Sequence, residues 1–215
     1  MKHLIIIGAR GYGRGLYDIV RDLPGYGIEF DVKGYLDDKT DALQGYQNYP
    51  SIIDSVENYV VQDDDVFACA LGDLNYKKHY VEIIKSKGGR FMTIIHPSVR
   101  VGVNAHVGEG CIIGYMSQLD CDVTIGNFVN IQTMAIIGHD STIGDWSIID
   151  CQTFMGGFSS LGTSVSLHTG SKVLPRVEVG DNVVINAGSL VIHNVKPNTI
   201  VMGNPARELI VPGNI

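Results

Sequence analysis

Aliphatic residues recur at every sixth position from Val101 to Val191, and this repeat is the strongest pattern in the chain. All sixteen positions hold Val, Ile, Leu or Met, with no shift of phase. Four residues after each of them stands a small residue, which is Ala, Cys, Ser, Thr or Val. A period of six fits neither an α-helix nor a simple alternating strand, so it indicates a structural repeat.

The six-residue unit predicts short strands separated by corners. The small residue and the next aliphatic residue are two positions apart, so their side chains point to the same face of one strand. Gly directly follows the aliphatic residue in nine of the sixteen units, as at Gly102 and Gly138. We expect the chain to turn there, because glycine tolerates positive φ. Three strands and three corners close a triangular coil, and coils stacked about 4.8 Å apart bury the aliphatic side chains along one axis. The strands of an ordinary β-sandwich would not hold one phase over sixteen units.

The first 95 residues follow a different pattern, in which strand-like and helix-like segments alternate. Short apolar runs predict strands at 4–7, 32–36, 66–71 and 90–95. Helical spacing predicts helices from the glycine-rich loop to Asp22, over 52–59 and over 75–87. Such alternation predicts a parallel sheet in a Rossmann-like α/β domain.

The change of period at His96-Pro97 predicts the domain boundary. We expect a Rossmann-like domain over 1–95, a β-helix over 96–195 and a capping tail over 196–215. The tail would cover the last coil, which otherwise exposes an unpaired edge.

Composition limits the possible partners and the compartment. The formal net charge of −7 and the pI of about 5.4 argue against non-specific binding to nucleic acid or an anionic membrane. No apolar run reaches the length of a membrane span, and the N-terminus shows no signal-peptide pattern. The four cysteines form no C-x-x-C pair, which favours free thiols in a reducing compartment. We therefore expect a cytoplasmic protein.

A glycine-rich loop joins the first predicted strand to the first predicted helix. Its residues are Gly8-Ala9-Arg10-Gly11-Tyr12-Gly13, and a loop of this kind lets a phosphate approach the helix N-terminus. The spacing is G-x-x-G-x-G and not the dinucleotide fingerprint G-x-G-x-x-G. A nucleotide or nucleotide-sugar site is one interpretation, and a tight turn that needs glycine for packing is the other. Asp37-Asp38 end the second strand, where they either hold a ribose or base or form a solvated turn.

Within the repeat, residues 18 apart share a column, and this places a histidine with an acid at one corner. His139 falls between Cys121 and Gly157 of the adjacent coils, and Asp140 follows it. A carboxylate beside an imidazole raises its basicity, as a general base needs. A lone histidine in a solvent-facing turn is the alternative.

A second column competes for the role of base. Gln132, Asp150, His168 and Asn186 stack directly after the aliphatic position. Asp150 and His168 are one coil apart, near enough to pair. The alternative is a stacked polar ladder that satisfies outward side chains.

Several of these motifs together resemble the hexapeptide-repeat sugar O-/N-acetyltransferases. They are the glycine-rich loop, His96-Pro97-Ser98, the hexads, Gly138-His139-Asp140 and Gly203-Asn204-Pro205-Ala206-Arg207. This family includes sialic acid O-acetyltransferases and bacterial nucleotide-sugar N-acetyltransferases. The resemblance implies a left-handed parallel β-helix and a homotrimer, with acetyl-CoA bound between neighbouring β-helices.

The resemblance also implies a role for individual residues. It makes His139 the base and Asp140 the acid that tunes it, and it implies no metal. It places the nucleotide-sugar acceptor at Arg10, Gly11, Tyr12, Asp37, Asp38, Asn75 and Gln132. It places acetyl-CoA at Ile148, Thr169, Ala187, Asn204 and Arg207. The chain departs from the family at Gln132, where an asparagine is common, and at His168, where a small residue is usual.

These observations predict acetyl transfer from acetyl-CoA to the amino group of a nucleotide-linked amino sugar, in surface-polysaccharide synthesis. Direct transfer in a ternary complex is expected, because the repeat places no cysteine or serine beside His139. The alternatives are O-acetylation of a sialic acid or related sugar and a non-catalytic solenoid that binds nucleotide sugars.

Overall fold

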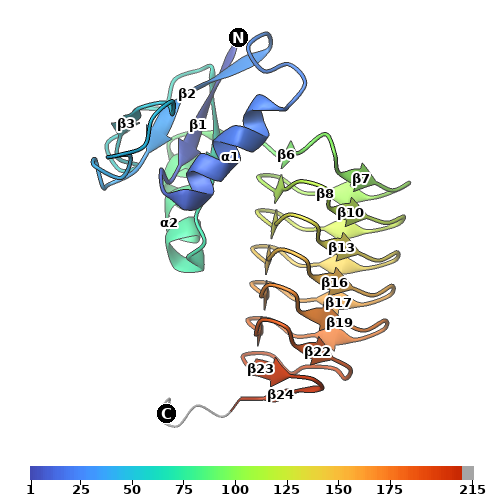
Figure 1. Cartoon of the computed structure of the whole chain (residues 1–215). Helices are drawn as coiled ribbons and strands as arrows, with labels where there is room; N and C mark the ends of the chain where they lie inside the picture. The colour runs from blue at the N-terminus through green and yellow to red at the C-terminus, as the bar shows by residue number, and fades with distance from the viewer. Residues whose placement is uncertain (210–215) are drawn as a thin grey trace. The chain divides into compact units, whose positions relative to one another are not determined.

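The computed structural model describes residues 1–209, which form two compact units. The first covers Met1–Pro97 and the second begins at Ser98 (Figure 1). No helix among the described residues is long and apolar enough to cross a membrane.

The first unit is built on a parallel sheet with the strand order β3-β2-β1-β4-β5. Its strands are β1 (Lys2–Ile7), β2 (Phe30–Leu36), β3 (Ile52–Asp54), β4 (Asp65–Cys69) and β5 (Arg90–Phe91). Helix α1 (Gly11–Arg21) connects β1 to β2, helix α2 (Leu74–Ser86) connects β4 to β5, and β6 (Ile94–Ile95) follows. The apolar run Leu4–Ile7 is fully buried in β1, at the centre of the sheet. The strand order reverses direction around β1, and ligands of open α/β sheets bind at such a point.

The helix predicted over 52–59 is wrong. Residues Ile52–Asp54 form the edge strand β3. The turn that follows is held by Lys87, whose side chain donates hydrogen bonds to three of its backbone carbonyls. The Nζ atom of Lys87 donates to the carbonyls of Val56, Glu57 and Tyr59 at 2.9, 2.5 and 3.0 Å. The predicted helical segment was short and lacked capping residues, so hydrogen bonding of β3 to β2 outweighs its helical spacing. The strand predicted over 90–95 is likewise divided into β5 and β6.

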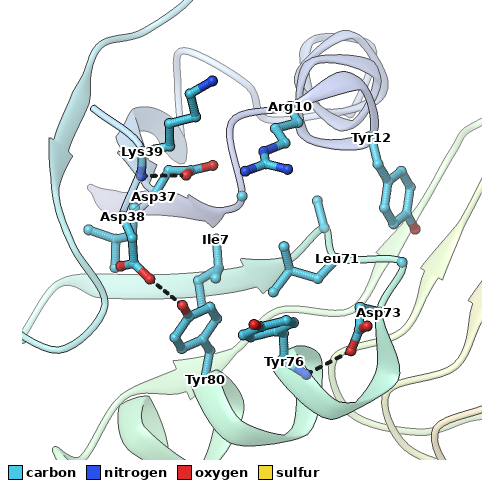
Figure 2. Close-up of a pocket in the computed structure, with 14 residues that line it drawn as sticks. Ile7, Arg10, Tyr12, Asp37, Asp38, Lys39, Leu71, Asp73, Tyr76 and Tyr80 are labelled. Atoms are coloured by element: carbon cyan, nitrogen blue, oxygen red, sulfur yellow. Dashed lines mark hydrogen bonds between the residues drawn. The ribbon is translucent and has the colours of Figure 1, made fainter. Parts of the chain in front are cut away.

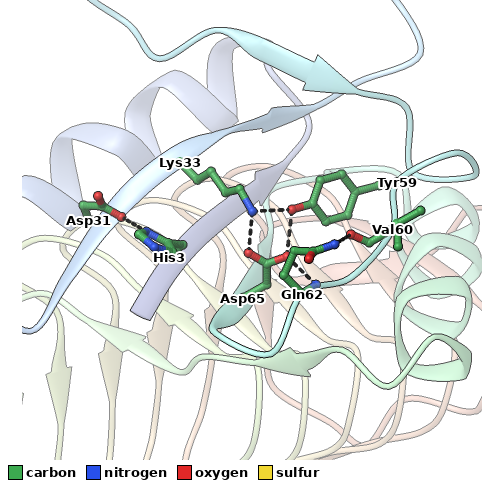
Figure 3. Close-up of polar contacts among 7 residues, drawn as sticks. All are labelled: His3, Asp31, Lys33, Tyr59, Val60, Gln62 and Asp65. Carbon is green, nitrogen blue, oxygen red and sulfur yellow. Dashed lines mark hydrogen bonds and ion pairs between the residues drawn. The ribbon is translucent and has the colours of Figure 1, made fainter. Parts of the chain in front are cut away.

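A polar network holds the loop that leads into β4 (Figure 3). Lys33 Nζ donates to Asp65 Oδ1 at 2.9 Å and to the Tyr59 hydroxyl at 2.8 Å, and that hydroxyl donates to Asp65 Oδ2 at 2.7 Å. Asp65 is 2% exposed. Burial disfavours its carboxylate, but the hydrogen bonds from Lys33, Tyr59 and the Gln62 amide outweigh burial and lower the pKa of Asp65.

The second unit is a parallel β-solenoid with two-residue strands on three faces, which we call sheets 1, 2 and 3. Sheet 1 contains β7 (Arg100–Val101), β10 (Gln118–Leu119), β13 (Ile136–Ile137), β16 (Phe154–Met155), β19 (Lys172–Val173) and β22 (Leu190–Val191). Sheet 2 contains β8 (His106–Val107), β11 (Thr124–Ile125), β14 (Thr142–Ile143), β17 (Ser160–Leu161) and β20 (Glu178–Val179). Sheet 3 contains β9 (Ile112–Ile113), β12 (Asn130–Ile131), β15 (Ile148–Ile149), β18 (Ser166–Leu167), β21 (Val184–Ile185), β23 (Ile200–Gly203) and β24 (Ala206–Glu208).

The register of the solenoid is the one the hexads predict. From β7 to β22 each strand pairs with the strand 18 residues away, as Ile137 does with Met155, whereas β23 pairs with β21 at a spacing of 16 residues, as Ile200 does with Val184. The second residue of each strand points inward, and these aliphatic side chains are buried from Ile113 to Val191. We name each corner after the sheet whose strand precedes it, so residues 138–141 belong to corner 1 and 150–153 to corner 3.

The structure corrects the role predicted for the corner glycines. Positive φ occurs three residues after the aliphatic position, at residues such as Asn104 (φ 58°) and Asp140 (φ 56°). The glycine directly after the aliphatic residue is needed for space. A Cβ at Gly102 would lie 2.5 Å from the backbone of Asp120, and one at Gly138 would lie 2.7 Å from the Gly157 nitrogen. These glycines therefore allow adjacent coils to approach closely.

The chain beyond Val195 extends the solenoid by a hairpin. Strand β23 pairs in parallel with β21, and β24 returns antiparallel to β23 through the cis Asn204–Pro205 bond. The part of the predicted capping tail at 210–215 lies outside the described residues.

Candidate functional site

A cavity of about 740 Å³ lies at the carboxyl ends of β1, β2 and β4 in the first unit (Figure 2). Its lining comes from the glycine-rich loop, the end of β2, the loop after β4 and the first turns of α2. The lining residues are Ile7, Gly8, Arg10, Tyr12, Leu36, Asp37, Asp38, Lys39, Ala70, Leu71, Gly72, Asp73, Tyr76 and Tyr80.

Two glycines shape the loop at the cavity. Gly8 has φ of +95°, and a Cβ at Gly13 would lie 1.8 Å from the Gly8 carbonyl oxygen. Neither position accepts a larger side chain, so the close turn that the sequence left as one alternative is present. The loop still leads into the N-terminus of α1, whose first amide groups have no partner within the helix.

The two acids at the end of β2 have different partners. Asp37 accepts from the backbone N–H groups of Ala9 and Lys39 at 2.8 and 2.9 Å, so it fastens the glycine-rich loop to β2. Asp38 accepts from the Tyr80 hydroxyl. Burial and the Asp38 carboxylate raise the pKa of Tyr80, which keeps that hydroxyl protonated as a donor.

Two cations line this cavity, Arg10 and Lys39, and the Nζ atom of Lys39 lies 3.7 Å from Asp41 Oδ1 in an exposed ion pair, which leaves Arg10 available to an anion. The Arg10 side chain extends into the cavity in Figure 2 and makes no ion pair with any described residue. The guanidinium can bind a phosphate through two parallel hydrogen bonds. A diphosphate beside Arg10 would also lie near the N-terminus of α1.

Four of the acceptor residues inferred from the resemblance line the cavity, and three, which are Gly11, Asn75 and Gln132, do not. Arg10, Tyr12, Asp37 and Asp38 line it. Gly11 begins α1, and Asn75 lies in the first turn of α2, where its backbone N–H donates to Asp73.

The sequence missed four polar residues of the lining, which are Lys39, Asp73, Tyr76 and Tyr80. The sequence predicted the helix over 75–87 but not that Tyr76 and Tyr80 line a cavity. Tyr76 is 60% exposed, whereas Lys77, Val81 and Ile84 form the buried side of α2.

The His139–Asp140 pair lies on corner 1 of the solenoid. His139 Nδ1 is 2.8 Å from Asp140 Oδ2, and both side chains are about half exposed. A carboxylate only accepts, so the pair favours a proton on Nδ1 and leaves the lone pair on Nε2. The next coil leaves room at Nε2 because Gly157 has no side chain. A Cβ at that position would lie only 2.6 Å from Nε2. The pair therefore presents a basic nitrogen beside a bare backbone.

Cys121 requires a correction to the expectation that no cysteine stands near the base. It occupies the same column as His139 one coil earlier, and its carbonyl accepts from the Asp140 N–H at 3.1 Å. Desolvation, a hydrogen bond to Asp122 and the charges of Asp122 and Asp140 raise the pKa of its thiol. The thiol is therefore held in its protonated, weakly nucleophilic form.

The second predicted pair is confirmed on corner 3, where His168 Nδ1 lies 3.0 Å from Asp150 Oδ2. Gln132, Thr169 and Ala187 share this corner. The solenoid thus carries two His–carboxylate pairs on different corners.

The remaining residues inferred to contact acetyl-CoA, like those on corner 3, do not lie on corner 1. Ile148 lies in β15 of sheet 3, and Asn204 lies in the final hairpin. Arg207 lines a separate cavity of about 310 Å³ with His193 and Lys196. One chain therefore places these residues and His139 on different faces. No group of three or more His, Cys, Asp or Glu residues that could hold a metal occurs in the described part of the chain.

Comparison with known proteins shows what this chain is similar to. Residues 3–84 match the PglD N-terminal domain. The acetyltransferase domain of PglB from Neisseria gonorrhoeae has a TM-score of 0.88 at 24% identity, covering 97% of this chain and 100% of that one. A mutant of perosamine N-acetyltransferase from Caulobacter crescentus, in complex with CoA and GDP-perosamine, has a TM-score of 0.88 at 21% identity and covers 98% of each chain. These matches confirm the predicted fold, a Rossmann-like domain followed by a hexapeptide-repeat β-helix.

A curated sequence relative supports the same resemblance. UDP-N-acetylbacillosamine N-acetyltransferase from Bacillus subtilis is 28% identical over 117 residues, which are 53% of this chain and 51% of the relative. The chain thus spans about half the length of this relative. Together the matches confirm the predicted resemblance to the hexapeptide-repeat sugar acetyltransferases.

Proposed function

We propose that the protein transfers an acetyl group from acetyl-CoA to the amino group of a nucleotide-linked amino sugar, for surface-polysaccharide synthesis in the cytoplasm. The observation that carries the proposal is the His139–Asp140 pair, whose Nε2 atom stands beside Gly157. The same chain holds a nucleotide-sized cavity with Arg10 at its edge.

His139 acts as the general base in this proposal. Acetyl-CoA supplies an acetyl group activated as a thioester. Nε2 accepts the proton that the sugar amine loses as its nitrogen bonds to the acetyl carbon. Asp140 stabilises the resulting imidazolium through Nδ1–H. The C–S bond breaks, and the proton on Nε2 is available to the departing thiolate, so atoms and charge balance.

Transfer is direct, without an acetyl-cysteine intermediate. Cys121 is the thiol in the column of His139, and its raised pKa makes it a poor nucleophile. A Cys121→Ser variant should keep its turnover within about twofold, because serine preserves the size of the side chain. Loss of turnover together with an acetylated Cys121 in the mass spectrum of the wild type would refute direct transfer.

The nucleotide end of the acceptor binds the cavity of the first unit. Arg10 pairs with the diphosphate, and the glycine-rich loop lets the diphosphate approach. Tyr76 and Tyr80 offer aromatic surface to the nucleobase. Binding of nucleoside diphosphates by calorimetry tests this assignment. Arg10→Gln should weaken binding at least tenfold, since it removes the charge that meets the diphosphate.

The active form is a homotrimer. One chain places His139 on corner 1 and the residues inferred for acetyl-CoA on sheet 3, corner 3 and the hairpin. A neighbouring chain that presents these residues to His139 would complete the site and exclude water. A stable, fully active monomer in a solution mass measurement would contradict this.

A panel of acceptors tests the proposed reaction. Thiol release from acetyl-CoA is measured with nucleotide-linked amino sugars, with the same nucleotides carrying unaminated sugars, and with sialic acid. We expect release with the amino sugars. Release with hydroxyl acceptors alone would favour O-acetylation, which the same base could catalyse. Nucleotide-sugar binding without release would favour a non-catalytic solenoid.

A further inference from the structure

A column of three residues with left-handed backbone runs down corner 1 at His139. Asp140, Phe158 and Arg176 are spaced 18 residues apart and have φ of 56, 59 and 64°. The repeat imposes left-handed backbone at this position. Asp and Asn tolerate it, whereas bulky side chains such as those of Phe and Arg adopt it rarely. The fold therefore explains the conformation of Phe158 but not the choice of residue.

Another aromatic residue at the same kind of position shows what packing alone achieves. Phe128 also has positive φ, of 56°, on corner 2. It stacks on Trp146 with ring centroids 4.5 Å apart and planes within 9°, and it is only 2% exposed. Burial thus offsets the backbone cost at Phe128. Phe158 is 48% exposed, so burial within the chain does not offset the cost there.

The contacts of Phe158 are directed to the base and to a cation. Its ring meets the His139 ring edge to face, at 5.1 Å between centroids and 88° between planes. The Arg176 guanidinium carbon lies 4.7 Å from the Phe158 ring centroid. Arg176 makes no ion pair with a described residue. A residue kept in a disfavoured conformation beside a reactive group points to function.

We propose that Phe158 is a specificity-determining residue, forming an apolar wall of the acceptor site with Arg176 positioning its ring. The proposal rests on the acetyl-transfer function above. Gly157 faces Nε2 and Phe158 follows it, so an amine within reach of Nε2 has its neighbouring sugar carbons against this ring. The C–H face of a sugar or a methyl substituent packs there. A hydroxymethyl group would lose hydrogen bonds to water without replacement.

Phe158→Asn separates this role from a structural one. Asparagine suits positive φ, so the variant should unfold at a higher temperature than the wild type. The value of kcat/KM for the amino-sugar acceptor should nevertheless fall by about tenfold or more, a loss typical of one apolar group in a specificity pocket. The KM for acetyl-CoA should change by less than about twofold, and Phe158→Tyr should restore most of the acceptor kinetics.

Met116→Asn is the matched control. Met116 has φ of 54°, is 66% exposed and lies on corner 3 of an early coil. Its replacement should raise the unfolding temperature in the same way and leave both KM values unchanged. The control therefore measures the benefit of asparagine at this backbone position alone.

Two acceptors that differ only in a methyl or hydroxymethyl group beside the amine give the decisive reading. The wild type should prefer the methyl acceptor by about tenfold or more, and Phe158→Asn should lose most of that preference. Arg176→Gln should lower both the kcat/KM for the amino-sugar acceptor and the preference for the methyl acceptor, each by a smaller factor than Phe158→Asn does. If the wild type is active and the Phe158→Asn variant is equally active and equally selective, the role proposed for Phe158 is overturned while the proposed acetyl transfer stands. A Phe158→Asn defect that appears only as a change in oligomer mass has the same consequence. A wild type that acetylates neither acceptor nor any other in the panel overturns the proposed function, and this proposal with it.

Discussion

The Nδ1 atom of His139 lies 2.8 Å from the Oδ2 atom of Asp140, the next residue in the chain. Neighbouring side chains meet here while Asp140 has φ of 56°, in the left-handed region that aspartate tolerates. The corner of the repeat and the carboxylate that contacts His139 thus depend on the same residue.

Asp140→Asn tests the charge without disturbing the corner. Asparagine adopts the same backbone conformation, but its amide is neutral and no longer stabilises an imidazolium. We expect kcat to fall by about 10- to 100-fold with acceptor KM nearly unchanged, as for a group that acts mainly in the transition state. A variant with wild-type kcat would show that the carboxylate has no part in the reaction.

Gly157→Ala should block the base sterically. The new Cβ would lie 2.6 Å from His139 Nε2, closer than any normal contact, so the imidazole must move away from the acceptor. We expect turnover to fall by at least about 100-fold, as for loss of a general base, while circular dichroism stays native. Gly15→Ala is the control, because nothing lies within 4 Å of a Cβ there. Equal activity of the two variants would contradict the geometry.

Lys33→Met should destabilise the first unit by removing the cation from the buried Asp65. Asp65 is buried and Lys33 is about one-third exposed, so we expect a loss of about 2–3 kcal/mol, at or below the lower end for a broken buried pair. Since the pKa of Asp65 is lowered on folding, its contribution is present above the unfolded carboxylate pKa and is lost as pH falls through the folded value. Urea unfolding should therefore show a gap between wild type and variant at pH 7 that narrows below about pH 4. Lys39→Met, which breaks an exposed 3.7 Å pair with Asp41, should shift stability by less than about 0.5 kcal/mol. A gap that stays constant with pH would argue against the assigned ion pair.

The periodicity of the aliphatic residues predicted the part of the fold in which that spacing alone decides which side chains are buried. The hexads fixed the register of every coil, because shifting the phase would expose the inward aliphatic residues. The same register placed His168 beside Asp150. Periodicity failed where neighbours in space decide the outcome. Residues 52–54 became a strand because β2 offered an edge for hydrogen bonding.

The candidate sites were predictable to the extent that they follow the chain locally. His139 and Asp140 are adjacent, so their pairing could be anticipated from the sequence. The part of the cavity that α2 supplies could not, because Tyr76 and Tyr80 reach it only through the packing of α2 on the sheet. The reason for Gly102 was also out of reach, since it depends on the backbone of the next coil.

The pH dependence of turnover in two single mutants tests the central claim most directly, because the solenoid carries two His–carboxylate pairs. If His139 is the base, His139→Ala should lower turnover by about 10² to 10⁴-fold and abolish the acidic limb of the profile. His168→Asn should weaken acetyl-CoA binding modestly and leave the limb in place. Loss of the limb in His168→Asn alone, with His139→Ala retaining it, would transfer the role of base to the Asp150–His168 pair and contradict the account.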